Sequence, residues 1–330
     1  MTDRPQQQRA DLVGAGLVAL AAACFGTLGP LSRFANAAGV ASLPLVTWRA
    51  ALGAGVVLGF IGLRRLVRGR PSGWSVRDIP VRDRWFMAAA AAANCILNFA
   101  AFVAFERTSI ALTLLVFYLY PAGVALASTL WFGDRLDRSR WAALGISLVG
   151  TALVLAGAGP LGELDGLGIG LAFVAALAQV FYVLAARHGF AHVPGPQAAA
   201  FTMGGASILY LGIALLTGTL MQLAQPLASV AAFWPVLLAG VIGAGIPTLA
   251  FILGIRRLGA PTAAIISTLE PVVGVALAAW LLNEQPAPLQ IAGGALILAA
   301  AALLQLRPGP PAEHEAVPTH TDEGATDVLA

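Results

Sequence analysis

An apolar run at residues 261–282 holds one charged residue, Glu270, close to its middle. A run of that length is long enough to cross a bilayer as a single helix. A carboxyl group at such depth costs several kcal/mol unless it is neutral, paired or facing a polar cavity, so it marks a functional site by default. Glu270 is therefore the first candidate site residue. The alternative is a protonated, hydrogen-bonded side chain that only helps helices to pack.

The residue after Glu270 is Pro271, which predicts an interruption of the helix at this point. Proline removes a backbone donor and clashes with the carbonyl group four residues back. The freed backbone groups are tolerated inside a membrane only where protein or a cavity surrounds them. Ser267, about one turn earlier, shares the face of Glu270 and is a further candidate. The same reasoning predicts kinks or hinges at Pro30, Pro121 and Pro247.

The composition of the chain predicts an all-α integral membrane protein. Hydrophobic residues make up 58% of the 330 residues and charged residues 11%, a balance far from that of soluble domains. The lipid bilayer is then its first partner, and nothing in the sequence points to nucleic acid. Cys24 and Cys95 both lie in apolar runs, where small buried side chains are expected rather than a disulfide or metal ligands.

Ten apolar runs are long enough to be transmembrane spans: 12–31, 43–63, 85–105, 110–132, 141–158, 166–186, 197–217, 231–255, 261–282 and 288–306. A cleaved leader ending before Cys24 is the alternative for the first run, but the run continues past that cysteine. Residues 1–11 are predicted to be a short cytoplasmic lead. Residues 307–330 are rich in proline and acidic side chains, which predicts a disordered cytoplasmic tail.

The placement of arginine sets the orientation, because cytoplasmic loops of membrane proteins carry an excess of cations. With a cytoplasmic N-terminus, 16 of the 19 cationic residues fall on the cytoplasmic side. Arg33 and Arg107 fall outside, and Arg49 lies within the second span. This distribution predicts that both termini are cytoplasmic.

The chain also repeats itself at an offset of 150 residues. Leu119-Tyr120-Pro121 aligns with Leu269-Glu270-Pro271, and Arg107 aligns with Arg257. Each half, 12–158 and 165–306, then holds five spans, and an odd number places the halves in opposite orientations. Inverted repeats of this kind give many secondary transporters a substrate site near the membrane midplane. The symmetry breaks where Tyr120 in one half corresponds to Glu270 in the other.

At this point the sequence resembles the EamA-type family of the drug/metabolite transporter superfamily. The residues that carry the resemblance are Phe25-Gly26-Thr27, Trp48-Arg49, Leu269-Glu270-Pro271-Val272, Leu282-Asn283-Glu284 and Gly293-x-x-Leu296-Ile297. The resemblance covers both halves and implies ten helices in two inverted five-helix repeats, an inner-membrane location and transport of small metabolites, often outward. The chain departs from the family pattern at Tyr120, Gly133-Asp134 and Ala300. These departures leave the substrate open.

Other polar side chains within the predicted spans are candidates for substrate binding or ion coupling. Arg49 lies roughly 9 Å below the outer end of its span, at about 1.5 Å per residue. It could pair with Glu270, or it could extend to the membrane interface as an anchor. Asn94 and Asn98 lie one turn apart, and Thr248 takes the repeat position of Asn98; hydrogen bonding between helices explains these three equally well. The same two readings apply to Gln179, Tyr182, Tyr118 and Tyr120.

The sequence lacks the usual motifs of enzymes. His188 and His192 have the spacing of a metal pair, but two ligands without a third make no metal site. The sequence contains no phosphate-binding loop, zinc-protease motif, serine nucleophile elbow or lysine. We therefore expect no catalytic activity, metal or cofactor. A non-transporting scaffold or scramblase remains a rival class.

These patterns predict a secondary transporter that exports small, amino-acid-like metabolites by alternating access. A multidrug or nucleotide-sugar carrier is the alternative within transport. Few aromatic residues lie deep in the predicted spans, which disfavours a large aromatic cavity. Protons are the candidate coupling ion, and the sequence leaves the oligomeric state open, a homodimer included.

Overall fold

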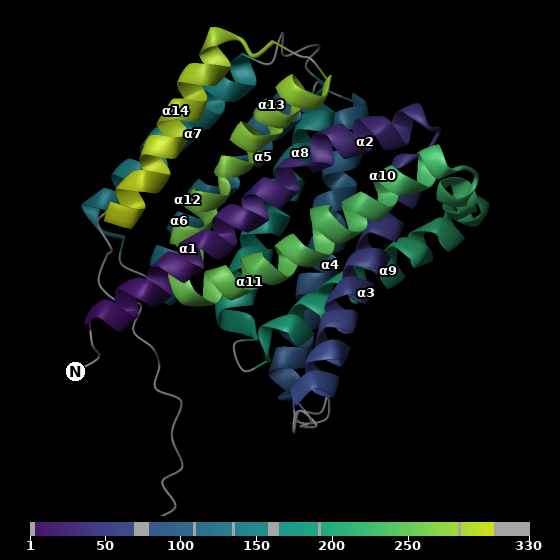
Figure 1. Cartoon of the computed structure of the whole chain (residues 1–330), viewed down its shortest axis with the longest axis horizontal. Helices are drawn as coiled ribbons and strands as arrows, with labels where there is room; N and C mark the ends of the chain where they lie inside the picture. The colour runs from purple at the N-terminus through teal and green to yellow at the C-terminus, as the bar shows by residue number, and fades with distance from the viewer. Residues whose placement is uncertain are drawn as a thin grey trace, which may run out of the picture.

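The computed structural model describes residues 4–68, 79–107, 110–133, 136–157, 165–190, 193–282 and 285–306, and all regular structure within them is helical (Figure 1). The elements of the first half are α1 (Arg4–Gly26), α2 (Leu28–Ala37), α3 (Ser42–Arg68), α4 (Val81–Arg107), α5 (Ile110–Phe117), α6 (Tyr120–Phe132) and α7 (Arg138–Ala156). Those of the second half are α8 (Gly166–Leu184), η2 (Ala185–Gly189), α9 (Gly195–Leu216), η3 (Leu220–Leu227), α10 (Val230–Gly240), η4 (Val241–Gly245), α11 (Ile246–Leu258), α12 (Ala260–Ser267), α13 (Leu269–Leu282) and α14 (Pro288–Leu306). The chain is thus an all-α membrane protein, as predicted.

Eight helical stretches in the described residues are long and apolar enough to cross a membrane. They are Asp11–Ala37, Ser42–Val67, Val81–Ala104, Thr113–Phe132, Gly166–Gly189, Gly195–Leu216, Val230–Leu258 and Ala260–Leu281. Each overlaps one predicted span. The other two predicted spans correspond to α7 and α14, which form helices of 19 residues but fall outside this set. The first helix begins at Arg4, so the expected lead is helical from that residue on. The expected tail lies outside the described residues.

Several of these stretches are interrupted near their centres. Thr27 separates α1 from α2, where both its backbone N–H and its hydroxyl donate to the carbonyl of Cys24. Tyr118 and Leu119 separate α5 from α6, and Thr268 separates α12 from α13. Pro121 and Pro271 lie in the first turns of α6 and α13, where a missing backbone N–H removes no helical hydrogen bond.

Two prolines remain from the predicted kinks, and both lie beside a break. Pro247 follows the π-helical segment η4 at the start of α11. Pro30 lies in the first turn of α2, directly after the interruption at Thr27. All four prolines therefore adjoin a change in helix geometry.

The helices of the two halves recur at the sequence offset of 150 residues. Helix α12 (Ala260–Ser267) repeats α5 (Ile110–Phe117), and α14 (Pro288–Leu306) repeats α7 (Arg138–Ala156), with the same lengths. The main contacts between halves join α7 to α14, α3 to α9, α4 to α8 and α1 to α11. The last two pairs correspond to each other under the repeat, which indicates an approximate two-fold relation.

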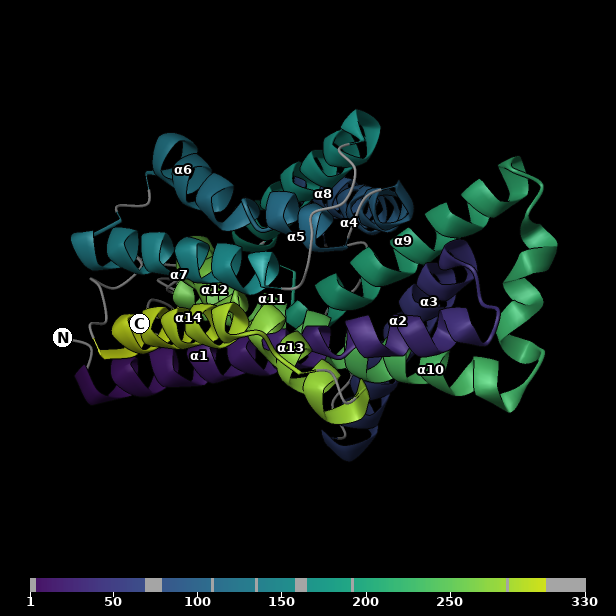
Figure 2. The same cartoon turned by 90° about the horizontal axis from the view of Figure 1, so that it is seen from above.

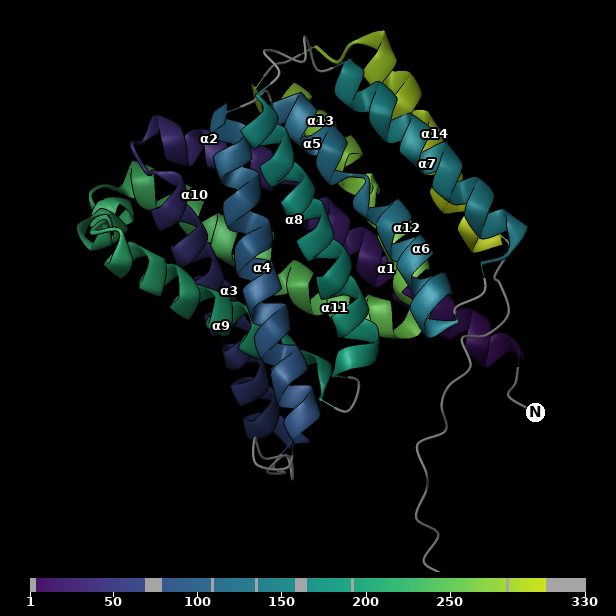
Figure 3. The same cartoon turned by 180° about the vertical axis from the view of Figure 1, so that it is seen from behind.

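Close helix packing explains how α7 and α14 hold together. They run side by side along one edge of the molecule (Figures 1 and 3). A Cβ atom added at Gly150 would lie 2.7 Å from the carbonyl oxygen of Gly293, and one added at Gly293 would lie 2.4 Å from that of Gly150. Paired glycines thus allow the two backbones to touch, the usual means of helix association in membranes.

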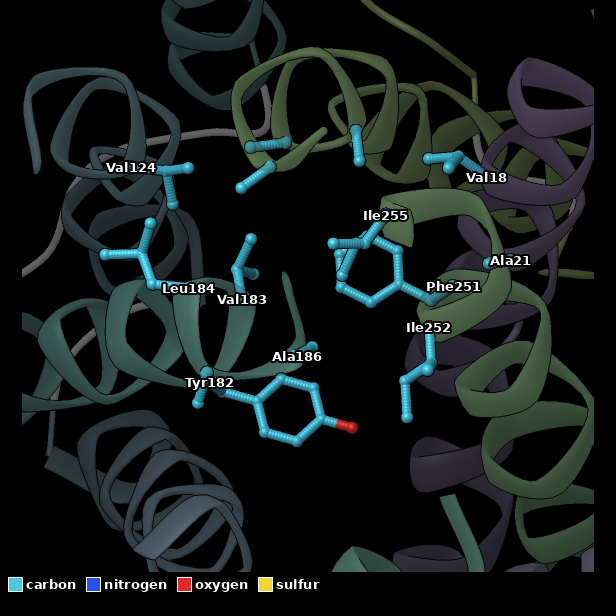
Figure 4. Close-up of a cluster of buried hydrophobic side chains, with 14 of the residues drawn as sticks. Val18, Ala21, Val124, Tyr182, Val183, Leu184, Ala186, Phe251, Ile252 and Ile255 are labelled. Atoms are coloured by element: carbon cyan, nitrogen blue, oxygen red, sulfur yellow. The ribbon is translucent and has the colours of Figure 1, made fainter. Parts of the chain in front are cut away.

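The core lies between the halves. Figure 2, seen from above, shows α1, α11, α12 and α13 running through the middle of the molecule. A cluster of buried apolar side chains joins α1, α8 and α11, and Figure 4 shows Val183 and Leu184 on one side of the interior and Phe251 and Ile255 on the other. Polar residues interrupt this core next to the helix breaks, and they form the candidate site.

Candidate functional site

Glu270 lies in the first turn of α13, directly after the interruption at Thr268. Its side chain is partly accessible, although Ser267, Thr268 and Pro271 around it are buried. A helix N-terminus carries a partial positive charge and unpaired N–H groups, so this position favours a carboxylate. Helix α1 approaches closely from the other side, since a Cβ atom at Gly26 would lie 3.0 Å from the Glu270 carbonyl oxygen.

The Glu270 carboxyl group has one charged and one polar neighbour. The Tyr118 hydroxyl is placed to donate a hydrogen bond to it, and Arg49 acts on it electrostatically. Among the described residues no arginine nitrogen lies within 4.0 Å of its oxygens. The carboxyl group is thus partly accessible and makes no ion pair in the described part of the chain.

Three aromatic rings gather beside this acid. The ring centroids of Phe117 and Tyr120 are 5.2 Å apart, those of Phe117 and Tyr118 are 5.5 Å apart, and those of Tyr118 and Tyr120 are 6.2 Å apart. The Tyr120 hydroxyl forms a hydrogen bond with the Ser267 hydroxyl, which ties α6 to α12 across the two halves. Gln179 on α8 lies near the same hydroxyl. The sequence expectation of few deep aromatic residues therefore misses a local cluster.

Arg49 makes its hydrogen bonds to a backbone carbonyl and an asparagine, while Glu270 acts on it electrostatically. Its Nε and Nη2 atoms donate to the carbonyl oxygen of Gly243 at 3.3 and 3.0 Å, and its Nη1 atom donates to Oδ1 of Asn98 at 2.7 Å. In a regular helix the Gly243 carbonyl would accept from the N–H of residue 247, but Pro247 has none. The guanidinium group fills this vacancy and so joins α3 and α4 to the second half.

A small polar cavity lies next to this arginine. It has a volume of about 20 Å³, and its walls are Val46, Arg49, Ala50, Asn94, Asn98, Met203, Tyr210, Ala244 and Thr248. The structure thus brings Arg49, Asn94, Asn98 and Thr248 together around one cavity. Sequence reasoning missed Tyr210 and Met203 on α9, because neither stands out from the many apolar residues of that helix.

Tyr182 lies on α8 behind the cavity, at the edge of the apolar cluster in Figure 4. Its hydroxyl is buried and has no hydrogen-bond partner within the described residues. Thr202 and Asn94 are its polar neighbours. Tyr182 therefore borders the site through Asn94.

The ends of the molecule hold the remaining charged contacts. At one end Arg107 Nε pairs with Asp165 Oδ2 at 2.7 Å, linking the last residue of α4 to the residue before α8. Asp165 also accepts from the N–H groups of Leu167 and Gly168, at 2.8 and 3.4 Å. The bond from Leu167 above all, with Arg107 adding to it, holds the pKa of Asp165 below its usual value.

The histidine pair adds no metal-binding geometry to the described residues. His188 stacks on Phe132 with ring centroids 4.0 Å apart, and His192 lies outside the described residues. No group of three or more histidine, cysteine, aspartate or glutamate side chains comes together in the part of the chain that the structure describes.

Comparison with known proteins agrees with this architecture. The sequence model of the EamA-like transporter family matches residues 12–156 and again residues 166–306. The uncharacterized transporter YxxF of Bacillus subtilis (strain 168) is 28% identical over 287 residues, which cover 86% of each chain. A solved crystal structure with 23% sequence identity superposes with a TM-score of 0.72, covering 90% of this chain and 98% of the other. The last likeness concerns the fold alone.

Proposed function

Because the chain belongs to the EamA-like transporter family, we propose that it is a secondary transporter that moves small, amino-acid-like metabolites out of the cell by alternating access. Its repeats, residues 12–158 and 165–306, would form ten membrane helices in inverted orientation. Both termini would lie in the cytoplasm, and the protein would reside in the cytoplasmic membrane. The family makes it a transporter of small molecules in a bilayer; substrate, direction and mechanism are the proposal.

The observation that carries the proposal is the position of Glu270. It lies at the start of a half-helix, partly accessible, where the interruptions of α5–α6 and α12–α13 meet. Secondary transporters build their substrate and ion sites from such discontinuous helices near the midplane. An acid kept there without an ion pair in the described residues serves either the cationic group of a substrate or a coupling proton.

The small cavity beside Arg49 and the aromatic rings beside Glu270 indicate which class of substrate the site favours. The polar cavity of about 20 Å³ beside Arg49 has room for about one water-sized group, so it supports a site that takes one polar end of a solute. The rings of Phe117, Tyr118 and Tyr120 beside Glu270 support recognition of an organic cation, since aromatic faces attract cationic groups. A small metabolite that carries an amine would fit both the polar cavity and the aromatic rings beside Glu270.

The test is Glu270→Gln in proteoliposomes, screened against amino acids and related amines with and without a proton gradient. Glutamine keeps the shape of a protonated glutamate but cannot ionise. Since a hydrogen bond to a charged group contributes roughly 1.5 to 3 kcal/mol, we expect flux to fall by about tenfold or more at normal expression. Glu163→Gln, between the two matched repeats, is the control.

Two patterns of loss separate the roles of Glu270. If it carries a proton, exchange of substrate survives in Glu270→Gln while accumulation against a gradient fails. If it binds the amine, exchange and accumulation fall together. Full transport by Glu270→Gln would remove the residue on which the proposal rests.

A further inference from the structure

We propose that Arg49, Asn94 and Thr248 form a subsite for an anionic group, the carboxylate of the transported molecule. This inference rests on the proposed function and adds the second half of its substrate. Glu270 serves a cationic group, whereas the cavity beside Arg49 accepts the opposite charge. The argument depends on which hydrogen-bonding groups remain free in that cavity.

Arg49 is held in place by hydrogen bonds that engage only some of its N–H donors. A guanidinium group carries five N–H donors and no acceptor. The contacts to Gly243 and Asn98 occupy one donor on each of its three nitrogens. One N–H on Nη1 and one on Nη2 have no further partner within the described residues. These two N–H groups remain for a ligand, and a carboxylate is the acceptor that guanidinium donors bind most strongly.

The asparagines extend this donor character. Because Arg49 can only donate, the side-chain oxygen of Asn98 must face it, at 2.7 Å. The Asn98 amide nitrogen then donates to the side-chain oxygen and the backbone oxygen of Asn94, both at 2.8 Å. Both side-chain oxygens are thereby occupied. The Asn94 amide nitrogen lies near the Tyr182 hydroxyl, and because it carries two N–H groups it keeps a donor for the cavity.

The other polar walls are the hydroxyl groups of Tyr210 and Thr248, which add no charged acceptor. The Tyr210 hydroxyl donates to the backbone carbonyl of Cys95 at 3.2 Å. The Thr248 hydroxyl makes no hydrogen bond within the described residues and is a further donor. A cavity with one positive charge and several converging donors selects an acceptor that is negatively charged. Its volume of about 20 Å³ holds about one oxygen-sized group.

The charge of Arg49 is also left without a contact ion. Glu270 acts on it electrostatically, but no carboxylate oxygen lies within 4.0 Å of its nitrogens in the described part of the chain. Arg49 is partly buried, and a cation removed from water is stabilised when it is paired and hydrogen-bonded. A bound carboxylate completes that pairing, while the substrate's amine meets Glu270.

The first experiment measures the thermal stability of the purified full chain in detergent, with propionate, propionamide or chloride added. A ligand that binds only the folded state raises Tm. We expect propionate to raise Tm of the wild type and propionamide, which has the same shape without the charge, to leave it unchanged. An equal rise with chloride would show an inorganic anion site and overturn the carboxylate assignment, as would equal rises with propionate and propionamide.

The variants are Arg49→Gln and Asn98→Asp, with Arg65→Gln, exposed on the same helix, as the control. Asn98→Asp places a carboxylate against Arg49, so the anchor is kept while the positive charge is neutralised. Both variants should lose the propionate effect, and Arg65→Gln should keep it. If Arg49→Gln does not fold, Asn98→Asp decides, and a wild-type response to propionate in that variant would refute the subsite.

The second experiment measures transport of the best amino acid found in the screen and of its amide. We expect the wild type to prefer the acid by about tenfold or more, the value of one charge-assisted contact. Asn98→Asp should abolish that preference while transport of the amide continues. Equal transport of both by the wild type refutes the anionic subsite and leaves the transporter intact. Absence of all transport refutes the proposed function, and the Tm measurement still decides the subsite.

Discussion

At the scale of single residues, proline does more here than bend helices. Pro247 deprives the Gly243 carbonyl of its usual helical donor, and Arg49 occupies that carbonyl instead. The arginine is thereby tied to the backbone of η4, whereas Glu270 lies in the first turn of α13. The two charges are held by different elements because Pro247 leaves the Gly243 carbonyl open to Arg49.

This account predicts the effect of Pro247→Ala. Alanine restores the N–H at residue 247, which competes with Arg49 for the Gly243 carbonyl. Since one hydrogen bond contributes roughly 1 kcal/mol, we expect flux to fall by about fivefold while Tm is unchanged or higher. Flux in proteoliposomes and Tm in detergent are the measurements. A fall in Tm that parallels the fall in flux would show that Pro247 matters only for folding.

The sequence predicts Glu270 and the polar set around it, but not how they connect. A lone acid in an apolar run, and two asparagines one turn apart, are visible without a structure. The partner of Arg49 is a backbone carbonyl 194 residues away, and no side-chain pattern marks it. The one feature of the sequence that points to this contact is Pro247, four residues after Gly243. It predicts that the Gly243 carbonyl lacks its helical donor, but it does not predict which side chain donates instead. The ring cluster of Phe117, Tyr118 and Tyr120 escapes prediction because an interruption turns adjacent residues toward one another.

At the scale of elements, the two halves are joined by the ends of helices as well as by their faces. Asp165 caps α8 with its side chain and also pairs with Arg107 at the end of α4. The repeat places Arg257 on α11 at the position of Arg107. Asp11 on α1 takes the position of Asp165 at a slightly different offset, the one that aligns Gly14-Ala15-Gly16-Leu17 with Gly168-Ile169-Gly170-Leu171. There Arg257 donates to its own Leu253 carbonyl, and Arg140 is the cation that acts on Asp11. The repeat therefore preserves the residue types at both ends, but the ion pair forms at one end.

Two substitutions separate the roles of Asp165. Asparagine keeps a capping oxygen but loses the ion pair with Arg107, whereas alanine loses both. We expect Tm to decrease in the order wild type, Asp165→Asn, Asp165→Ala, with the larger step between the last two, because an exposed ion pair contributes little. Equal Tm values for Asp165→Asn and Asp165→Ala would show that the capping hydrogen bonds of Asp165 do not stabilise the start of α8.

The pH dependence of the same contact has a fixed sign. The pKa of Asp165 is lowered in the folded chain, so its contribution is complete above the ordinary aspartate pKa of about 3.9. It is lost as the pH falls through the lower pKa of the folded state. The difference in Tm between wild type and Asp165→Asn should therefore shrink on acidification. A difference that grows on acidification would contradict the assignment.

At the scale of the whole molecule, the repeat was easier to predict than the span count. Matching lengths of α5 with α12 and of α7 with α14 follow the offset read from the sequence. Among the described residues eight helices satisfy length and hydropathy, and α7 and α14 pack against each other through Gly150 and Gly293. A topology measurement is the experiment that tests the predicted count of ten.

That experiment is a topology measurement, and the arginines set its expected outcome. Arg187 donates to the Arg256 carbonyl, so the ends of α8–η2 and α11 adjoin at an arginine-rich end of the molecule. The Arg107–Asp165 pair lies at the opposite end, where α4 ends and α8 begins (Figure 3). Since cations collect on the cytoplasmic side, we expect a reporter after Leu306 to be cytoplasmic and one inserted near Gly162 to be exported. An exported C-terminus would require an odd number of spans, and then two five-span halves in opposite orientations could not exist.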